Sequence, residues 1–537
     1  MKVIIIGGGY AGLAAATMLC EQPNIEVEIY EKEFSLGGQA RSMYTNKCNV
    51  EYAWRVFGRC YHNVWFLFDK LGIMGNFDII KNLCIIDNTI SDGVPYANSM
   101  LHKVLEDVPF DKYYKYLNFL FLCKERAITE YDNVNLMNYF DHNTMIKSLG
   151  GPYLGMDAKR LSVSSFMKYL YSTVDPKTYS FSAPDIMITN KPTSDAIFDP
   201  WEKFLLKKGV RIHKNATLQE IEMDETIQSV KINDETHTAD EYVFACSLQY
   251  INSLLPPSCK TFKDMKTLET DLQLYFSFNL YFSEETNMEC TYFVLNDEGW
   301  QPLVQRKILW DEKVTKRCDS NIKEVWNVAL LDLFKGTFNK KYISECSIEE
   351  VIQEGIREMR ENKKLKKMLK KPLDEIMIDY EYWYEFKDKN GKVTVSNPKF
   401  SVNEGTSFLL PSSQPTDIPK NMFLAGYYTQ STQGGASMES SSETGMNAAK
   451  KVLEKHNIRC DKPIKHTNEA LVFYYVLLPF ILLDKLLYQF KLNPITDYIN
   501  STFLLLVYFI LLVILFILLV TSKTVRKLKQ FRNFFKS

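Results

Sequence analysis

Residues 1–42, MKVIIIGGGYAGLAAATMLCEQPNIEVEIYEKEFSLGGQARS, decide the fold of this chain. Lys2 to Ile6 is a short apolar run rich in β-branched side chains, which is typical of a buried parallel strand. A glycine-rich turn leads into small residues from Ala11 to Cys20, which predict a helix, and Val27 to Tyr30 predicts a second strand. Strand, glycine turn, helix and strand in this order predict a Rossmann-like α/β domain that binds a dinucleotide.

The turn contains Gly-x-Gly-x-x-Gly on Gly7, Gly9 and Gly12. The first glycine permits the tight turn, the second lets the backbone approach a pyrophosphate, and the third lets the helix pack closely on the strand. The helix N-terminus supplies amides and the positive end of its dipole to the phosphates, so Ala11 is placed with the glycines in the cofactor site. Glu31 ends the second strand, where a carboxylate accepts hydrogen bonds from the ribose hydroxyls.

The residues after Glu31 distinguish FAD from NAD. After five intervening residues comes GGQARS, residues 37–42. This resembles the acid-x5-Gly-Gly-x-x-Arg-Ser/Thr extension of FAD enzymes in the superfamily of flavin-containing amine oxidases and carotene (phytoene) desaturases. The resemblance implies that Gly38 and Arg41 border the pyrophosphate and the flavin, with Arg41 as a charge-assisted donor. The family often has Arg or Lys where this chain has Gln39, so one cation is missing.

The composition excludes several classes of function. The 537 residues give room for two or three domains and a tail, and a net charge of −1 argues against a nucleic-acid partner. The 11 cysteines are scattered, with no Cys-x-x-Cys, which favours reduced thiols in a cytosolic setting and argues against a structural zinc site. The strand predicted to begin at residue 2 leaves no room for a preceding signal peptide.

A second match to the superfamily lies within residues 50–73. In the family, an acid, a polar residue near the flavin and a Tyr-x-Asn precede a helix here, and four residues fall at those spacings: Glu51, Arg55, Tyr61 and Asn63. Many carotene desaturases carry His where this chain has Arg55. A buried Arg55 beside the flavin would stabilise negative charge on it or orient an acceptor, which makes Arg55 the catalytic candidate. The alternative role is a salt bridge between domains.

The middle of the chain predicts an interleaved organisation. Ala216 to Ile221 predicts a strand that in the family lays its backbone against the adenine, so Leu218 is carried over as a cofactor residue. Strands around Leu272–Phe282 and Glu324–Leu333 and a helix from Ile348 predict an α+β substrate domain. The expected FAD-binding domain is discontinuous and comprises residues 1–75, 200–255 and 415–455. The expected substrate domain comprises residues 76–199 and 256–414, and a membrane-anchoring tail follows over 456–537.

Residues 421–449 carry a closing motif. A short strand meets Gly426, and a helix begins near Ser437. This resembles the superfamily's final FAD motif, Leu-Ala-Gly-acid … Ser-Met-Glu-Gly-Ala, and its Tyr-Thr-Gln and Ala-Ser-Met-Glu look most like plant and cyanobacterial carotene desaturases. The resemblance implies that Gly426 and Met438 contact the cofactor, with the helix dipole aimed at the pyrimidine edge of the flavin.

Three positions depart from the family pattern. Tyr427 stands where an acid is expected, which removes a contact to the ribityl chain or a phosphate, and Ser440 replaces a glycine. Amine oxidases of the superfamily usually place an aromatic residue where this chain has Ser437. The serine therefore favours dehydrogenation of an apolar chain over oxidation of an amine. No cysteine lies between Cys346 and Cys460, so the FAD is expected to be non-covalent.

The C-terminal tail is strongly apolar. Phe503 to Val520 is an uninterrupted run of 18 apolar residues, and we expect a transmembrane helix over 503–521 that enters the lipid bilayer. Basic residues follow it, which the positive-inside rule keeps in the cytosol. The absence of an export signal also places the catalytic part in the cytosol, so a single span would put the basic tail on the opposite side of the membrane, against this rule. A single anchor is preferred over a hairpin with a first leg at 470–483. The expected location is a membrane, with C-terminal anchoring and a catalytic domain that faces the cytosol.

These features together predict a membrane-anchored FAD oxidoreductase that takes hydride from a hydrophobic substrate and passes the electrons to oxygen or a membrane quinone. The first alternative is an amine oxidase with an amine substrate, which fits the superfamily and the anchor. The second is a non-catalytic flavin-binding membrane scaffold, which fits the changes at Tyr427 and Ser440. The expected fold is α/β, with a three-layer Rossmann-like FAD-binding domain, an interleaved α+β substrate domain and a C-terminal transmembrane helix.

Overall fold

The structure is a computed structural model. It describes residues 1–53, 55–58, 61–79, 83–86, 94–95, 132–139, 159–172, 186–288, 290–295, 299–308 and 317–460, with single positions 463 and 510. All of these except position 510 belong to one compact unit, Met1–Val104 and Lys124–Thr467. Among the described residues no helix is long and apolar enough to cross a membrane. Apart from position 510, the expected transmembrane segment 503–521 lies outside the described residues, as does the segment 470–483.

A five-stranded parallel sheet organises the N-terminal part of the chain, in the order β10-β2-β1-β14-β24. Its strands are β1 (Lys2–Ile6), β2 (Glu26–Glu31), β10 (Arg211–Lys214), β14 (Glu241–Phe244) and β24 (Met422–Leu424). The sheet therefore gathers strands from the start, the middle and the end of the described chain. This arrangement confirms the predicted Rossmann-like α/β fold.

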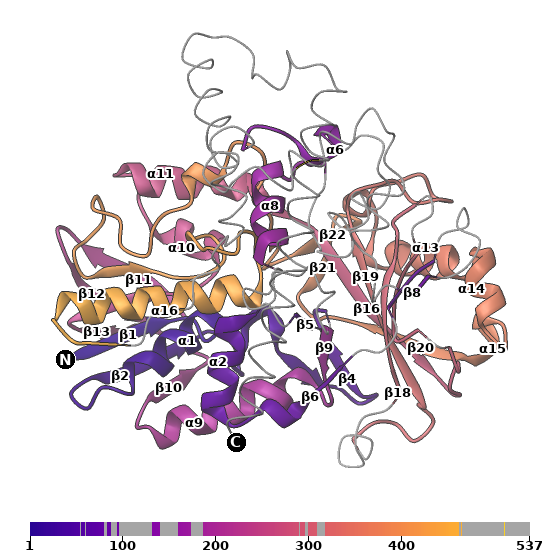
Figure 1. The fold of residues 1–537 in the computed structure, drawn as a ribbon, viewed down its shortest axis with the longest axis horizontal. Coiled ribbons are helices and arrows are strands. Elements are labelled where there is room, and N and C mark those ends of the chain that lie inside the picture. Colours follow the sequence, from indigo (N-terminus) through magenta and orange to yellow (C-terminus); the bar gives the residue numbers. More distant parts are fainter. Residues whose placement is uncertain are drawn as a thin grey trace, which may run out of the picture. The chain divides into compact units, whose positions relative to one another are not determined.

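The sheet is the central layer of three (Figure 1). Because side chains alternate along a strand, Val3 and Ile5 point to one face and Ile4 and Ile6 to the other. The first pair packs on the helices α1 (Tyr10–Leu19), α2 (His62–Leu71), α9 (Asp199–Lys207) and α16 (Met438–Lys455). The second pair packs on β11 (Leu218–Met223), β12 (Ile227–Ile232), α10 (Leu248–Leu254) and α11 (Lys260–Thr267), and β13 (Glu235–His237) pairs with β12. Both faces of the sheet are thus covered.

A seven-stranded mixed sheet forms the other large element of this unit, in the order β20-β16-β19-β18-β17-β7-β8. Its strands are β20 (Met377–Tyr382), β16 (Tyr275–Phe282), β19 (Glu324–Leu331), β18 (Leu303–Ile308), β17 (Tyr292–Leu295), β7 (Leu83–Ile86) and β8 (Val94–Pro95). The helix α13 (Ile348–Glu361) packs on one face, since a Cβ built on Gly355 would lie 3.3 Å from the Phe278 ring. From the other face Asn279 Nδ2 donates to the Asn49 carbonyl at 2.8 Å, which joins this sheet to the N-terminal part.

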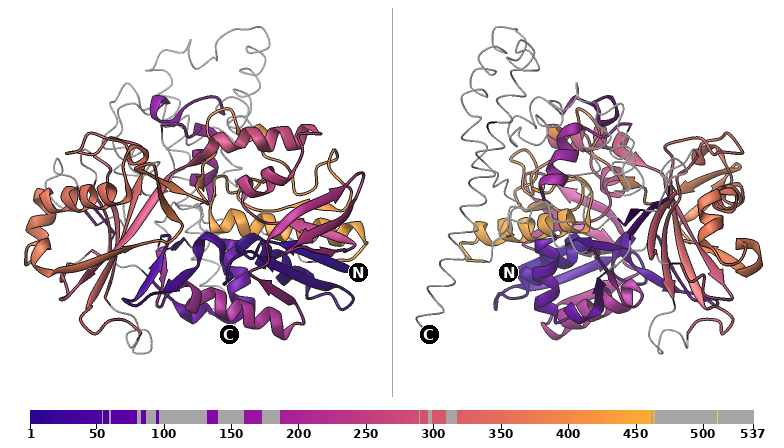
Figure 2. Two further views of the ribbon diagram at one scale, coloured as in Figure 1. Left: turned by 180° about the vertical axis from the view of Figure 1, so that it is seen from behind. Right: turned by 45° about the vertical axis from the view of Figure 1, so that its right-hand side comes forward.

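Smaller elements lie around the two sheets (Figure 1 and Figure 2). The strands are β3 (Ser42–Tyr44), β4 (Asn49–Glu51), β5 (Val56–Gly58), β6 (Phe77–Ile79), β9 (Ile186–Thr189), β15 (Leu272–Gln273), β21 (Phe386–Lys389), β22 (Lys392–Val395) and β23 (Lys399–Phe400). The helices are α6 (Leu136–Tyr139), α8 (Val163–Ser172), α14 (Lys363–Met368), α15 (Leu373–Ile376) and the π-helix η6 (Ser194–Phe198). The strand expected over 272–282 is divided, because β15 pairs with β23 while β16 joins the large sheet.

A disulfide joins Cys48, in the turn between β3 and β4, to Cys318. Tyr281, Ile322 and Val325 pack around it. This corrects the expectation that the cysteines are reduced. The two cysteines are 270 residues apart, and the β3–β4 hairpin brings them together by packing beside β19, which the spacing of cysteines in the sequence does not reveal.

We expect peptide mapping without reductant, on protein alkylated during lysis, to recover Cys48 and Cys318 in one linked species. The double variant Cys48→Ser, Cys318→Ser should lower the free energy of unfolding by about 2–5 kcal/mol, because the crosslink restricts the unfolded chain. Thermal unfolding measures the change, and Cys259→Ser, at a cysteine outside any disulfide, is the control. Two separately alkylated peptides would contradict the pairing and would support the predicted cytosolic orientation.

Candidate functional site

The turn between β1 and α1 has the geometry of a phosphate-binding loop. Gly7 lies in the left-handed region with φ 106°, and its N–H donates to the Tyr30 carbonyl at 2.8 Å. A Cβ on Gly12 would lie 1.9 Å from the Gly7 carbonyl oxygen, so only glycine lets α1 begin this close to the strand. The N-cap residue of α1 is Gly9, which has no side chain to cap the first amides. These amides are therefore placed to bind an anion.

Gly9 and Gly38 face each other beside this turn. A Cβ on Gly38 would lie 3.3 Å from the Gly9 Cα, and a Cβ on Gly9 would lie 3.9 Å from the Gly38 Cα. The Gly37 N–H donates to the Gly8 carbonyl at 2.8 Å and holds the two turns together. Two surfaces without side chains, next to uncapped helix amides, form a cradle that a Cβ would fill. This cradle fits the pyrophosphate of a dinucleotide.

Glu31 is fixed at the carboxyl end of β2. Its Oε2 accepts from the Gly8 N–H at 2.7 Å, and its Oε1 accepts from the Glu33 N–H at 3.0 Å. Burial raises the pKa of this carboxyl, and the two backbone N–H groups oppose that rise. Each oxygen keeps a further lone pair. The carboxylate is thus held in place with lone pairs to spare, and its contact to ribose hydroxyls stays a prediction.

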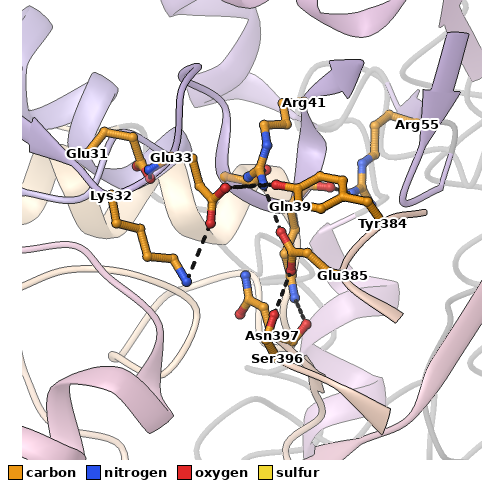
Figure 3. A network of polar contacts seen from close by, with 11 residues as sticks. Glu31, Lys32, Glu33, Gln39, Arg41, Arg55, Tyr384, Glu385, Ser396 and Asn397 are labelled. Carbon is orange, nitrogen blue, oxygen red and sulfur yellow. Dashed lines mark hydrogen bonds and ion pairs between the residues drawn. The ribbon is translucent and has the colours of Figure 1, made fainter. Parts of the chain in front are cut away.

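Arg41 lies at the centre of a polar network (Figure 3). Its guanidinium is buried and donates to the Gly38 carbonyl and to Glu385 Oε1, both at 2.7 Å. It also donates to the Tyr384 hydroxyl, and Glu33 Oε2 lies 3.2 Å from its Nη2. Two carboxylates therefore balance the charge of Arg41 within the chain.

The network limits what Arg41 offers to a cofactor. The rings of Trp383 and Tyr384 lie 5.3 and 5.6 Å from the guanidinium carbon, which adds cation–π contacts. The Nε atom is a buried donor without a hydrogen-bond partner in the described part of the chain, and a cofactor contact of Arg41 stays a prediction.

Arg55 lies next to the same turn. Its Nη2 donates to the carbonyl of Gln39, and its Nε is buried without a partner in the described part of the chain. The nearby carboxylate of Glu51 accepts from the Thr193 N–H at 2.9 Å and from the Thr193 hydroxyl at 2.7 Å. No ion pair links Arg55 to a described residue, so the alternative of an interdomain salt bridge finds no support there.

The closing motif brings a second helix N-terminus to this region. Gly426 has φ 126°, and its N–H donates to Thr444 Oγ1 at 3.0 Å. Met438 is the first residue of α16, and Ser437 caps the helix in reciprocal hydrogen bonds with Ser440, at 2.9 and 3.0 Å. Ser440, which replaces the glycine of the family motif, therefore has a structural use as half of a capping box.

Glu439 is a functional residue that the sequence reasoning did not assign. Its carboxylate is fully buried and accepts from the N–H groups of Asn63 and Val64, both at 2.9 Å, and from the Asn63 side chain at 2.7 Å. It caps α2 from a helix that lies far along the chain. An acid in the first turn of a helix was the available signal, but it does not indicate a partner on another helix.

Two further predicted positions, Tyr427 and Leu218, make contacts within the protein. The Tyr427 hydroxyl accepts from the Leu248 N–H at 3.3 Å, and its ring lies 5.3 Å from Phe400. Tyr427 thus packs against α10 and does not substitute for the acid of the family. The buried Leu218 accepts at its carbonyl from the Tyr250 hydroxyl. Among the described residues no group of His, Cys, Asp and Glu could hold a metal ion.

Comparisons with known proteins agree with this geometry. Residues 5–71 match the family model described as an NAD(P)-binding Rossmann-like domain. A zeta-carotene desaturase of Synechocystis sp. is 23% identical over 302 residues, which are 49% of this chain and 60% of that protein. The chloroplastic/chromoplastic zeta-carotene desaturase of Arabidopsis thaliana is 25% identical over 318 residues, 50% of this chain and 55% of that protein.

These matches support the resemblance to the superfamily of flavin-containing amine oxidases and carotene desaturases. The chain spans little more than half the length of these two desaturases. Two solved structures share the fold, each at 13% sequence identity over 84% of this chain. They are an oxidoreductase from Methanosarcina mazei, covered over its full length with a TM-score of 0.57, and a putative protoporphyrinogen oxidase from Exiguobacterium sp., with a TM-score of 0.55 over 99% of its length.

The cradle predicts different effects at two glycines. A Cβ at Gly9 meets no protein atom closer than 3.9 Å, so Gly9→Ala should fold but fill the space for the pyrophosphate. We expect its flavin content, measured from visible absorbance after purification, to fall by about tenfold or more. Gly12→Ala should instead lower the yield of folded protein, because its Cβ would collide with the Gly7 carbonyl.

The matched control is Gly75→Ala, because a Cβ there meets nothing within 4 Å. It should retain wild-type flavin content and thermal stability. Equal flavin content in Gly9→Ala and wild type would contradict the assignment of the cradle.

Proposed function

We propose that this protein is a membrane-anchored, FAD-dependent oxidoreductase that dehydrogenates a hydrophobic substrate. The observation that carries the proposal is the convergence of three features at the carboxyl edge of one parallel sheet. They are the cradle of Gly9 and Gly38, the fixed carboxylate of Glu31, and the turn at Gly426 that leads to the N-terminus of α16. Ligands of open α/β sheets bind at this edge.

The residues present fit FAD. Glu31 would hold the ribose, and the first amides of α1 with Gly9 and Gly38 would hold the pyrophosphate. The N-terminus of α16 at Met438 would face the flavin, where its dipole favours negative charge. When bound, FAD supplies an acceptor for hydride from a substrate C–H or C–N bond.

The desaturase-like reaction is the form of this proposal that the site supports best. The relatives in the comparison are named as desaturases of zeta-carotene, and a hydrophobic substrate is therefore the natural expectation for this chain. Ser437 hydrogen-bonds Gln433 and Ser440, so the position that is aromatic in amine oxidases is polar here. Oxygen or a membrane quinone is the proposed electron acceptor.

Anaerobic reduction of the bound flavin tests the reaction. We expect polyunsaturated or isoprenoid substrates to bleach the visible flavin absorbance of detergent-purified protein, with recovery on addition of a quinone or oxygen. Bleaching by amines alone would overturn the substrate class and identify an amine oxidase. Protein that binds flavin but is bleached by neither class would identify the non-catalytic scaffold.

Membrane anchoring is the second part of the proposal and rests on the apolar run at 503–520. We expect the full-length protein to remain in the membrane pellet after alkaline carbonate extraction. Deletion of residues 503–537 should release the protein to the supernatant with its flavin, because every residue of the cradle lies before position 461. A full-length protein extracted by carbonate would contradict the anchor.

A further inference from the structure

Two cationic side chains lie beside the cofactor turn and both are positioned through Gln39. Arg55 Nη2 donates to the Gln39 carbonyl. The Gln39 side chain donates to the carbonyls of Asn397, at 2.5 Å, and Pro398, at 3.3 Å. Lys399 is the next residue and begins β23. Gln39 thus holds the side chain of Arg55 through its carbonyl, and through its own side chain it holds the backbone just before Lys399.

The two cations border an aromatic wall. Lys399 Nζ lies 5.2 Å from the centroid of the Tyr275 ring, and the ring of Tyr52 stacks on that of Tyr275 at 5.8 Å. The Tyr52 hydroxyl donates to the backbone carbonyl of Tyr275 at 3.0 Å, which fixes the Tyr52 ring. Arg55 acts electrostatically on both tyrosines and on Tyr10 of α1. The arrangement places positive charge beside two buried aromatic rings.

The carboxylates near this pair already have partners. Glu51 accepts two hydrogen bonds from Thr193, and Glu385 accepts from Arg41. The buried Nε of Arg55 has no partner among the described residues, although buried donors are normally satisfied. A buried, unpartnered guanidinium nitrogen beside a second cation indicates the place of an anionic acceptor that belongs to a ligand.

We propose that Arg55 and Lys399 form a carboxylate subsite, and that the substrate is therefore a hydrophobic carboxylic acid. This inference rests on the proposed function, because the flavin proposed to bind at the carboxyl edge of the parallel sheet defines where the apolar part of the substrate would be oxidised. The carboxylate accepts hydrogen bonds from both cations while the hydrocarbon chain lies on the tyrosine rings. The same pair repels an ammonium group, which gives a physical reason for this site to reject amines.

The subsite carries a pH dependence with a definite sign. Burial and the like charge of Arg55 lower the pKa of Lys399 to about 7, so the lysine is cationic below that pH and loses its proton above it. Carboxylate affinity should thus be highest below pH 7 and decrease by up to about tenfold per pH unit above it.

Three tyrosines and Glu51 also face the pair. Burial raises the pKa of Tyr275 to about 12 and raises those of Tyr52 and Tyr10 further, so the tyrosines stay neutral. Burial also raises the pKa of Glu51 to about 7, and its ionisation would weaken anion binding in the same direction. Lys399→Arg separates the two effects, because it removes the titration of the lysine and keeps that of the glutamate.

Calorimetric titration of the full-length, flavin-containing protein with three ligands of equal chain length tests the proposal. Octanoate, octan-1-ol and octylammonium are compared at pH 6 in the same detergent. We expect octanoate to bind about tenfold tighter than the alcohol or better, and octylammonium to bind weakest. Lys399→Met should remove the preference for octanoate, and Lys399→Arg should keep it without the decrease above pH 7. Lys392→Met, at an exposed lysine of β22, is the matched control and should change nothing.

Three outcomes would overturn the subsite. They are equal binding of the three ligands, tightest binding of octylammonium, and loss of flavin from the Lys399→Met protein, which would assign the cation to the cofactor itself. Arg55→Met provides an independent second variant with the same expected loss of preference. The readout is binding and not turnover, so octanoate selectivity without any flavin bleaching would support the subsite while contradicting the proposed function.

Discussion

The site depends on how closely α1 packs against its neighbours. A Cβ on Gly12 would lie 1.9 Å from the Gly7 carbonyl oxygen, and a Cβ on Gly445 would lie 2.0 Å from the Ala11 carbonyl oxygen. Backbone thus meets backbone on both sides of α1, at the strand and at α16. This close approach sets the positions of both helix N-termini at the carboxyl edge of the sheet, where the dipoles act on a bound anion. A larger residue at Gly12 would push α1 away from the sheet, and one at Gly445 would push α16 away from α1.

Buried carboxylates fix the loops around these helix ends. Glu31, Glu51 and Glu439 each accept hydrogen bonds from backbone N–H groups, which compensates the cost of removing a charge from water. Glu31 holds the cofactor turn to β2, and Glu51 holds β4 to the start of η6. Glu439 holds the beginning of α2 to α16. Each carboxylate thereby joins two segments that carry parts of the site.

The segment between β20 and β23 couples the seven-stranded sheet to the cofactor turn. Glu385 pairs with Arg41, and the residues before Lys399 accept hydrogen bonds from the side chain of Gln39. Gln39 stands where the family often has a cation, and its amide instead positions a cation that comes from β23. The same turn that approaches the pyrophosphate thus also organises the surface proposed to select the substrate.

The sequence alone determined the cofactor half of the molecule, because its signals are local. Gly7, Gly12 and Glu31 act within one strand–helix–strand unit, and their backbone requirements follow from residue type and spacing. Tertiary structure alone decided that Arg41 is neutralised by Glu385, which is 344 residues away, and that Lys399 lies beside Arg55. Contacts between distant polar side chains leave no periodic pattern in a sequence. They depend on where the connecting loops place each side chain once both sheets have formed.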